Sequence, residues 1–166
     1  MPTQEIKQKL ESKFSGIQIQ LIGEALLIKP EDLIRVADFL KNSDLKLNFL
    51  SSVTAVDYLE YFETVYHLYS IDKKTGPVVL KVCVPRNQLK MPSLVPVFRG
   101  AEFQEREAYD MMGIIYEGHP DLRRIFMWEG FEGHPLRKDY VPEDSDVLEW
   151  QDIEWLERHN IKVPEE

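Results

Sequence analysis

Residues 104–140 read QEREAYDMMGIIYEGHPDLRRIFMWEGFEGHPLRKDY, and the rest of the chain is organised around this stretch. It combines many charged residues, glycines and prolines with many large apolar side chains. Its first part has the charge pattern of a helix, which Gly113 is placed to end because glycine accepts positive φ. Two similar turns follow at 118–120 and 133–135, and each leads into a basic pair. Three uses of these polar groups are open: chemistry, binding, or support of the fold.

The length and the cysteine content set the first limits. A chain of 166 residues is expected to form one domain and to bury a core without a metal or a disulfide. Cys83 is the single cysteine, so no internal disulfide can form. One thiolate also cannot supply the cysteine set of an iron–sulfur cluster or of a structural zinc site. We therefore expect no cofactor bound by this chain.

The charge is distributed unevenly along the chain. From Val141 onward there are nine Asp and Glu against two Lys and Arg, whereas the preceding residues carry 20 acids and 18 bases. An almost neutral body with an acidic tail argues against nucleic acid or an anionic membrane surface as the main partner. The N-terminal residues show no signal-peptide pattern, and no apolar run approaches the ~20 residues that span a bilayer. A soluble chain without a membrane span is expected.

Hydrophobic periodicity predicts the elements before this stretch. Helices are expected over 3–14 and 30–42, and strands over 17–22, 25–28, 47–56, 61–71 and 78–84. The order α-β-β-α-β-β-β is typical of a two-layer α+β domain, with helices against one face of a sheet.

Residues 85–96 are expected to be a connector, followed by a helix over 101–112 and a turn-rich segment. This organisation predicts one domain over 1–140 and an acidic C-terminal tail or arm over 141–166. Within that tail, residues 144–159 fit either a helix or an extended arm lying on a neighbour.

His119 and His134 are the candidates for a metal ligand or a general base. They lie on separate turns, and no Cys, third His or Glu stands beside them at ligand spacing. A histidine before a proline is typical of a turn residue that bonds the local backbone. The sequence therefore favours turn residues over a metal site.

The acids of the helix 101–112 allow two interpretations. Glu105, Glu107 and Asp110 are candidates for paired acid–base carboxylates. On a helix, however, positions 105 and 107 point apart, whereas Arg106 and Asp110 stand four residues apart and can pair. The sequence favours a charged helix surface, or a buried ion network that holds the turns.

The basic pairs Arg123-Arg124 and Arg137-Lys138 are candidates for binding a phosphate or a carboxylate. Each pair has acidic neighbours, which favours internal pairing or the acidic face of a partner over a nucleotide. The sequence contains no phosphate-binding glycine loop, no His-Glu-x-x-His motif and no Gly-x-Ser-x-Gly elbow. A turn-rich polar segment of this kind is typical of a recognition surface, because loops carry much of protein function.

Three parts of the opening stretch carry a family resemblance. EREAYDMMGI at 105–114, GHPDLRRI at 118–125 and GHPLRKDY at 133–140 resemble, in order and spacing, the 30 kDa subunit of respiratory complex I. In the bacterial NADH:quinone oxidoreductase (NDH-1) this component is known as the C-type subunit. One turn departs from the family pattern, because Met-Trp-Glu-Gly-Phe at 127–131 stands where a sequence of the Met-Pro-Glu-Asp-Trp type is usual.

The resemblance implies a structural subunit of the peripheral arm of a proton-pumping NADH:quinone oxidoreductase, with no catalytic, cofactor-binding or metal-binding residues of its own. NADH or another donor, FMN, iron–sulfur clusters and quinone would be bound by neighbouring subunits. The implied partners are chiefly the hydrogenase-like 49 kDa-type (D-type) protein and iron–sulfur subunits. The implied location is the cytoplasmic side of the cell membrane, or the matrix or stroma side in an organelle.

The resemblance also marks ten residues as contacts to partner subunits or as braces of the turns. They are Glu105, Arg106, Glu107, Asp110, His119, Arg123, Arg124, Arg137, Lys138 and Asp139.

Other functions remain as alternatives. The same scaffold role exists in membrane-bound hydrogenases, in formate hydrogenlyase and in ferredoxin-dependent photosynthetic complexes. A free-standing enzyme would use Glu107 or Asp110 together with His119. A simple binding module would contact a soluble partner through its acidic tail.

Overall fold

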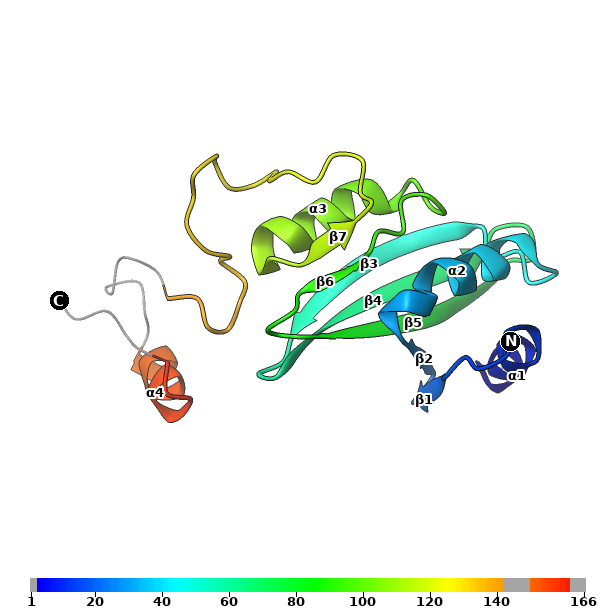
Figure 1. Ribbon diagram of the computed structural model, residues 1–166, viewed down its shortest axis with the longest axis horizontal. Coiled ribbons are helices and arrows are strands. Elements are labelled where there is room, and N and C mark those ends of the chain that lie inside the picture. The colour runs from blue at the N-terminus through cyan, green and yellow to red at the C-terminus, as the bar shows by residue number, and fades with distance from the viewer. Residues whose placement is uncertain (1–2, 142–149, 162–166) are drawn as a thin grey trace.

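The computed structural model describes residues 3–141 and 150–161, and it contains one five-stranded sheet (Figure 1). The strands are β1 (Gln20–Ile22), β2 (Ala25–Ile28), β3 (Phe49–Asp57), β4 (Tyr61–Ser70) and β5 (Thr75–Pro85). They lie side by side in the order β1-β2-β5-β4-β3. The β2–β5 pair is parallel, and the other pairs are antiparallel.

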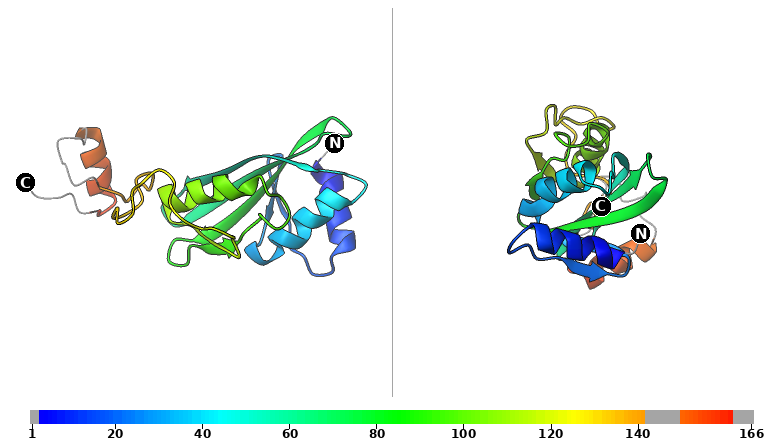
Figure 2. Two further views of the ribbon diagram at one scale, coloured as in Figure 1. Left: turned by 90° about the horizontal axis from the view of Figure 1, so that it is seen from above. Right: turned by 90° about the vertical axis from the view of Figure 1, so that its right-hand side faces the viewer.

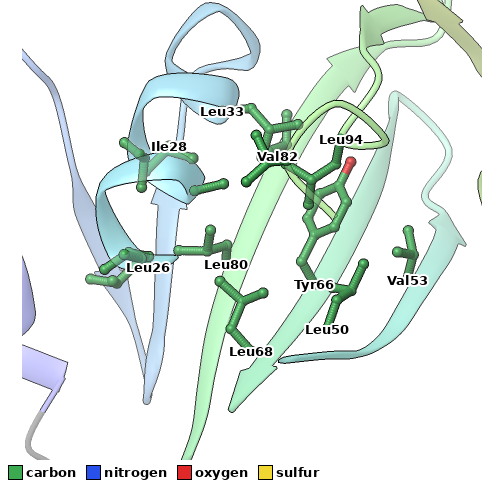
Figure 3. Close-up of a cluster of buried hydrophobic side chains, with 14 of the residues drawn as sticks. Leu26, Ile28, Leu33, Leu50, Val53, Tyr66, Leu68, Leu80, Val82 and Leu94 are labelled. Carbon is green, nitrogen blue, oxygen red and sulfur yellow. The ribbon is translucent and has the colours of Figure 1, made fainter. Parts of the chain in front are cut away.

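Alternation along β4 and β5 makes one face of this sheet the core. The β5 side chains that alternation predicts to share a face are buried: Val78, Leu80, Val82 and Val84. Their antiparallel partners on β4 are buried as well, since Leu80 stands opposite Tyr66 and Val84 opposite Phe62. Figure 3 shows side chains of this core gathered between the sheet and the chain that covers it.

Helices cover that face. They are α1 (Thr3–Lys13), the short 3-10 helix η1 (Pro30–Asp32), α2 (Leu33–Asn42) and α3 (Ala101–Met112). The apolar residues of α2 that recur at helical spacing are all buried: Leu33, Val36, Ala37 and Leu40. Ile6 and Leu10 of α1 enter the same core, and the rings of Phe14 and Phe39 meet edge to face at 5.6 Å beside it.

The predicted two-layer α+β fold is confirmed, and α2 and α3 lie on the same side of the sheet (Figure 2, left). Some boundaries differ from the prediction. β1 begins at Gln20 rather than at residue 17, although Ile17 and Ile19 are buried. β5 begins at Thr75, inside a segment predicted as a turn. The pairing of β4 with β5 continues to the end of their hairpin, where Thr75 stands opposite Ser70.

A second, two-stranded sheet was not predicted. Within the expected connector, β6 (Lys90–Pro92) pairs in parallel with β7 (Ile115–Glu117), which follows α3. Strands of three residues are too short to show periodicity. Their position depends instead on tertiary contacts: the hydroxyl of Thr64 on β4 lies 3.4 Å from both Met91 Sδ and the Tyr116 hydroxyl.

Part of the predicted tail is helical. The helix α4 (Trp150–Arg158) lies at the opposite end of the molecule from α1 (Figure 1), and Leu156 is its buried residue. An extended arm is therefore wrong for 150–158, while positions 144–149 of that prediction lie outside the described residues. None of the helices within 3–141 and 150–161 has the length and apolar character needed to cross a membrane.

Replacing Leu80 by alanine tests the position of the core. Truncation of this fully buried leucine leaves a cavity, so we expect the free energy of unfolding to fall by about 2–5 kcal/mol. Val79→Ala is the matched control, because Val79 lies on the opposite face and is only half-buried. Urea denaturation measures both variants, and equal losses would contradict the assignment of the core face.

Candidate functional site

A buried carboxylate on α3 organises the turn-rich segment. Asp110 has no exposed surface. Its Oδ2 accepts hydrogen bonds from three successive backbone amides, those of Ile125 (3.0 Å), Phe126 (2.7 Å) and Met127 (3.0 Å). Its Oδ1 accepts one from Arg124 Nη1 at 2.9 Å. The turn at 125–127 is therefore closed around a negative charge.

These contacts determine the ionisation of Asp110. Burial opposes the charged form, but the amides of residues 125–127 and the Arg124 guanidinium outweigh it, so the pKa of the carboxyl lies below its ordinary value. Arg124 also donates to the carbonyl of Gly133 at 3.0 Å. One ion pair thus fastens two separate turns to α3.

His134 joins the second turn to the end of α3. Its Nδ1 lies 2.9 Å from the Asp110 carbonyl, which can only accept, so Nδ1 carries the proton. Burial, followed by smaller effects including the Arg124 and Arg137 charges, lowers the pKa of this imidazole and favours its neutral form. The ring lies against Gly113, where an added Cβ would stand 2.6 Å from His134 Nε2. Gly113 therefore provides both the positive φ of +78° and the room for His134.

Arg106 has a different partner from the one predicted. The expected ion pair between Arg106 and Asp110 does not form, because Asp110 is saturated by the turn and by Arg124. Buried Arg106 instead donates through Nε to the Arg123 carbonyl at 3.1 Å and through Nη2 to the Arg124 carbonyl at 3.4 Å. It holds the backbone of the first basic pair rather than a neighbour on its own helix.

His119 is also fully engaged with backbone groups. The Asp121 amide donates to Nδ1 at 3.0 Å, so the proton of a neutral ring lies on Nε2 and is donated to the Glu102 carbonyl at 2.9 Å. Neither nitrogen is available for a substrate or a metal in this arrangement. The predicted turn role is what this geometry supports, and pairing of His119 with Glu107 or Asp110 for catalysis is not.

Glu105 is buried on the inner side of α3. Its Oε2 accepts from the Ser93 hydroxyl and its Oε1 from the Leu94 amide, both at 2.6 Å. Burial raises the pKa of Glu105 to about 7, although these two hydrogen bonds oppose the shift. No arginine or lysine pairs with this carboxyl among the described residues. Glu105 therefore holds to α3 the backbone that directly follows β6. The charge of its carboxyl changes near neutral pH.

A second network holds the end of the stretch. Asp57 on β3 binds the Arg86 guanidinium and accepts from the Lys138 amide at 2.8 Å. Asp139 accepts from Arg86 at 2.7 Å and takes both Nε and Nη2 of Arg137 at 2.8 Å. Burial opposes ionisation of Asp139, but these guanidinium groups hold the pKa of its carboxyl below the ordinary value.

Three of the ten predicted residues are exposed: Glu107, Arg123 and Lys138. The Arg123 side chain is 70% exposed, and it pairs at 2.9 Å with Asp121, itself about half exposed. Large apolar side chains between residues 103 and 140 are exposed as well, and there are five of them: Phe103, Ile115, Phe126, Trp128 and Leu136. The structure thus separates buried groups that face the fold from a charged and apolar set that faces outward.

In the part of the chain that the structure describes, no three His, Cys, Asp or Glu side chains converge, so no ligand set for a metal ion is found there. Burial raises the pKa of the Cys83 thiol to about 11, and the nearby Glu63 carboxylate adds to the shift. Such a thiol is a poor nucleophile at neutral pH.

The sequence interpretation missed Asp57, which lies 81 positions before Lys138 and bonds its amide, and Arg86, which lies 53 positions before Asp139 and pairs with it. No local spacing signals such a pairing. It also missed the exposed aromatic residues Phe126 and Trp128. Their signal was present, because large apolar side chains in a turn segment have no helical or strand periodicity that would bury them.

Asp110→Asn removes the charge but keeps the shape. One amide oxygen cannot satisfy three backbone donors and Arg124, so we expect a loss of about 2–4 kcal/mol in the free energy of unfolding. Because the folded pKa is lowered, the wild-type contribution is present above about pH 4 and is lost as the pH falls through the folded value. Urea titration measures the loss, with exposed Glu107→Gln as the control. Equal stability of the two variants would contradict this role of Asp110.

Glu105→Gln should change the pH dependence of stability. The folded pKa is raised, so the stabilising effect of the neutral carboxyl is complete at acidic pH and is lost as the pH rises through about 7. Between pH 5 and 8 the wild type should lose about 2–3 kcal/mol more than the variant. Urea titrations at several pH values measure this difference, and parallel pH profiles would show that Glu105 is already ionised at neutral pH.

Comparison with known proteins identifies the fold and the segment together. Residues 26–146 match the family model described as respiratory-chain NADH dehydrogenase, 30 Kd subunit. The chain is 48% identical over 120 residues to C-type subunit 2 of the NADH-quinone oxidoreductase of Rhizobium meliloti, a match that covers 70% of this chain and 65% of that relative. It is 41% identical over 145 residues to the corresponding C-type subunit of Geotalea uraniireducens, covering 83% of this chain and 87% of the relative.

A solved structure, described as Nqo5 of the trypsin-resistant fragment (1-134), is similar with a TM-score of 0.58 and 29% identity. The match covers 74% of this chain and 100% of that one. The family match includes β3, β4 and β5, the helix α3 and both polar networks. The chain therefore belongs to the family of the 30 kDa subunit of the respiratory-chain NADH dehydrogenase.

Proposed function

We propose that this chain is a non-catalytic structural subunit in the peripheral arm of a proton-pumping NADH:quinone oxidoreductase. It docks to the hydrogenase-like 49 kDa-type (D-type) protein and contributes to quinone reduction only within the assembly. The names of its relatives, which are NADH-quinone oxidoreductase subunits, favour this complex over the related hydrogenases. The main support is that charged and apolar side chains are exposed on a segment whose backbone is held by hydrogen bonds to buried side chains.

The ten family-marked residues divide between these two roles. The braces hold the segment to the sheet and to α3, and they are Glu105, Arg106, Asp110, His119, Arg124, Arg137 and Asp139. The contacts to a partner are Glu107, Arg123 and Lys138, because their side chains are exposed. Arginine suits such contacts, since its planar fork matches a carboxylate in two hydrogen bonds.

The exposed apolar groups support docking on physical grounds. Phe126, Trp128 and Leu136 are each more than half exposed within one short segment. Aromatic residues and arginine are enriched where protein interfaces gain most of their binding energy. A fastened backbone also reduces the conformational entropy lost on binding, which strengthens association.

The proposed role assigns the redox groups to other chains. Donor, FMN, iron–sulfur clusters and quinone belong to neighbouring subunits, including the iron–sulfur proteins, and this chain binds none of them. Electrons therefore do not pass through its side chains. Its place is on the cytoplasmic side of the membrane, or the equivalent side of an organelle membrane, where partner subunits hold it.

The adjacent residues Arg123 and Arg124 test this proposal as a matched pair. Arg123→Ala should leave the unfolding midpoint of the isolated chain within about 1 °C of wild type, because surface ion pairs contribute little. The same substitution should markedly reduce recovery of the 49 kDa-type protein with the affinity-tagged chain from cells. Arg124→Ala breaks the buried pair with Asp110, so it should destabilise the isolated chain itself by about 3 kcal/mol.

Thermal unfolding and quantitative mass spectrometry of the purified complex measure the two effects. Normal recovery of the complex by Arg123→Ala would remove this arginine from the interface. Turnover of NADH or quinone by the purified chain alone, abolished by His119→Ala, would replace the structural role with an enzymatic one.

A further inference from the structure

Trp128 forms the most prominent apolar projection of the turn-rich segment. Its side chain is 68% exposed. Its ring stands edge to face on Phe131, with the ring centroids 4.8 Å apart and the planes at 87°. Phe131 in turn lies 6.2 Å from Tyr140, and the Arg124 guanidinium stands 5.7 Å from its centroid. Trp128 therefore packs against a second aromatic ring, although most of its own surface is exposed.

Two acidic residues stand next to these aromatic residues in the sequence. Glu129 directly follows Trp128, and Glu132 directly follows Phe131; both are exposed. Neither carboxylate forms an ion pair with the described residues, in contrast to Asp110 and Asp139, whose guanidinium partners are taken. Within the described residues, the two acids that follow Trp128 and Phe131 therefore lack a paired cation.

An exposed indole with two exposed carboxylates within four positions of it in the sequence has a definite complement. The ring quadrupole attracts a cation placed over its face, and tryptophan does so more strongly than phenylalanine or tyrosine. A guanidinium can stack on the ring while its N–H groups donate to a neighbouring carboxylate. Ammonium groups are more strongly hydrated and cannot stack in this way.

We propose that Trp128, Glu129 and Glu132 form a receptor for an arginine side chain of a neighbouring protein subunit. This inference rests on the proposed docking function and names the chemistry of the partner at one point of that surface. The receptor is separate from the contact made by Arg123, which requires an acid on the partner. The two together predict a partner surface that carries both an exposed arginine and an exposed carboxylate.

Variants at position 128 separate attraction to a cation from simple apolar contact. Trp128→Leu keeps a large apolar side chain without an aromatic face, and we expect a loss of about tenfold or more in apparent affinity for the complex. Trp128→Phe keeps an aromatic face and should lose only a few-fold. The measurement is recovery of the affinity-tagged chain with its complex from cells, titrated by expression level.

The carboxylates are tested with the double variant Glu129→Gln, Glu132→Gln. Wild-type recovery should fall as NaCl is raised during washing, and the double variant should start lower and depend less on salt. Arg123→Ala is included in the same series. A structure of the assembled complex should place a guanidinium within about 6 Å of the Trp128 ring centroid.

Several outcomes would overturn the inference. Full recovery by Trp128→Leu, or salt dependence unchanged in the double variant, would leave at most an apolar contact. Self-association of the isolated chain that Trp128→Leu abolishes would make a second copy the occupant. If Arg123→Ala disrupts assembly while the variants at 128, 129 and 132 do not, this inference fails and the docking function stands; if none of them disrupts assembly, both fail.

Discussion

The structure of the C-terminal half depends on one buried charge, the carboxylate of Asp110. Three backbone amides and one guanidinium surround it, so the cost of removing the charge from water is offset only when the turn at 125–127 and Arg124 are in place. Asp110 thus makes the folding of α3 and of the turn interdependent. The remaining contacts extend from this point, because Arg124 also holds Gly133, and His134 bonds to the Asp110 carbonyl.

Hydrogen bonds from buried side chains to the backbone explain how a segment without long helices or strands can present a binding surface. Apolar elements normally position a loop by burying its side chains, but here charged side chains on α3 and the sheet hold the backbone. Burial of the outer side chains Phe126 and Trp128 is therefore not needed to hold the backbone, and both remain largely exposed. Polar networks of this kind specify one arrangement, because a half-filled network is costly. A fixed arrangement suits a subunit whose role is to be joined to others.

Much of the fold follows from sequence patterns, and the site follows only in part. The alternation of Val78, Leu80, Val82 and Val84 predicts the core face of β5, and the stripe on α2 predicts its buried side. β6 and β7 were missed because three residues show no period and their pairing joins segments on either side of α3. The predicted partner of Arg106 was wrong for a similar reason. Helical spacing allows a pair with Asp110, but both side chains instead form hydrogen bonds with residues 123–127. The links from Asp57 to Lys138 and Arg86 have no signal in local spacing.

The turn-rich segment takes its folded form in the isolated chain, without any partner. Amide hydrogen exchange of the isolated chain tests it most directly at Ile125, Phe126 and Met127, whose N–H groups donate to Asp110 and belong to no helix or strand. We expect strong protection of these three amides in the wild-type chain and its loss in Asp110→Asn. Exchange at the rate of an unstructured peptide in the isolated chain, with protection only in the assembled complex, would show that the segment folds on binding.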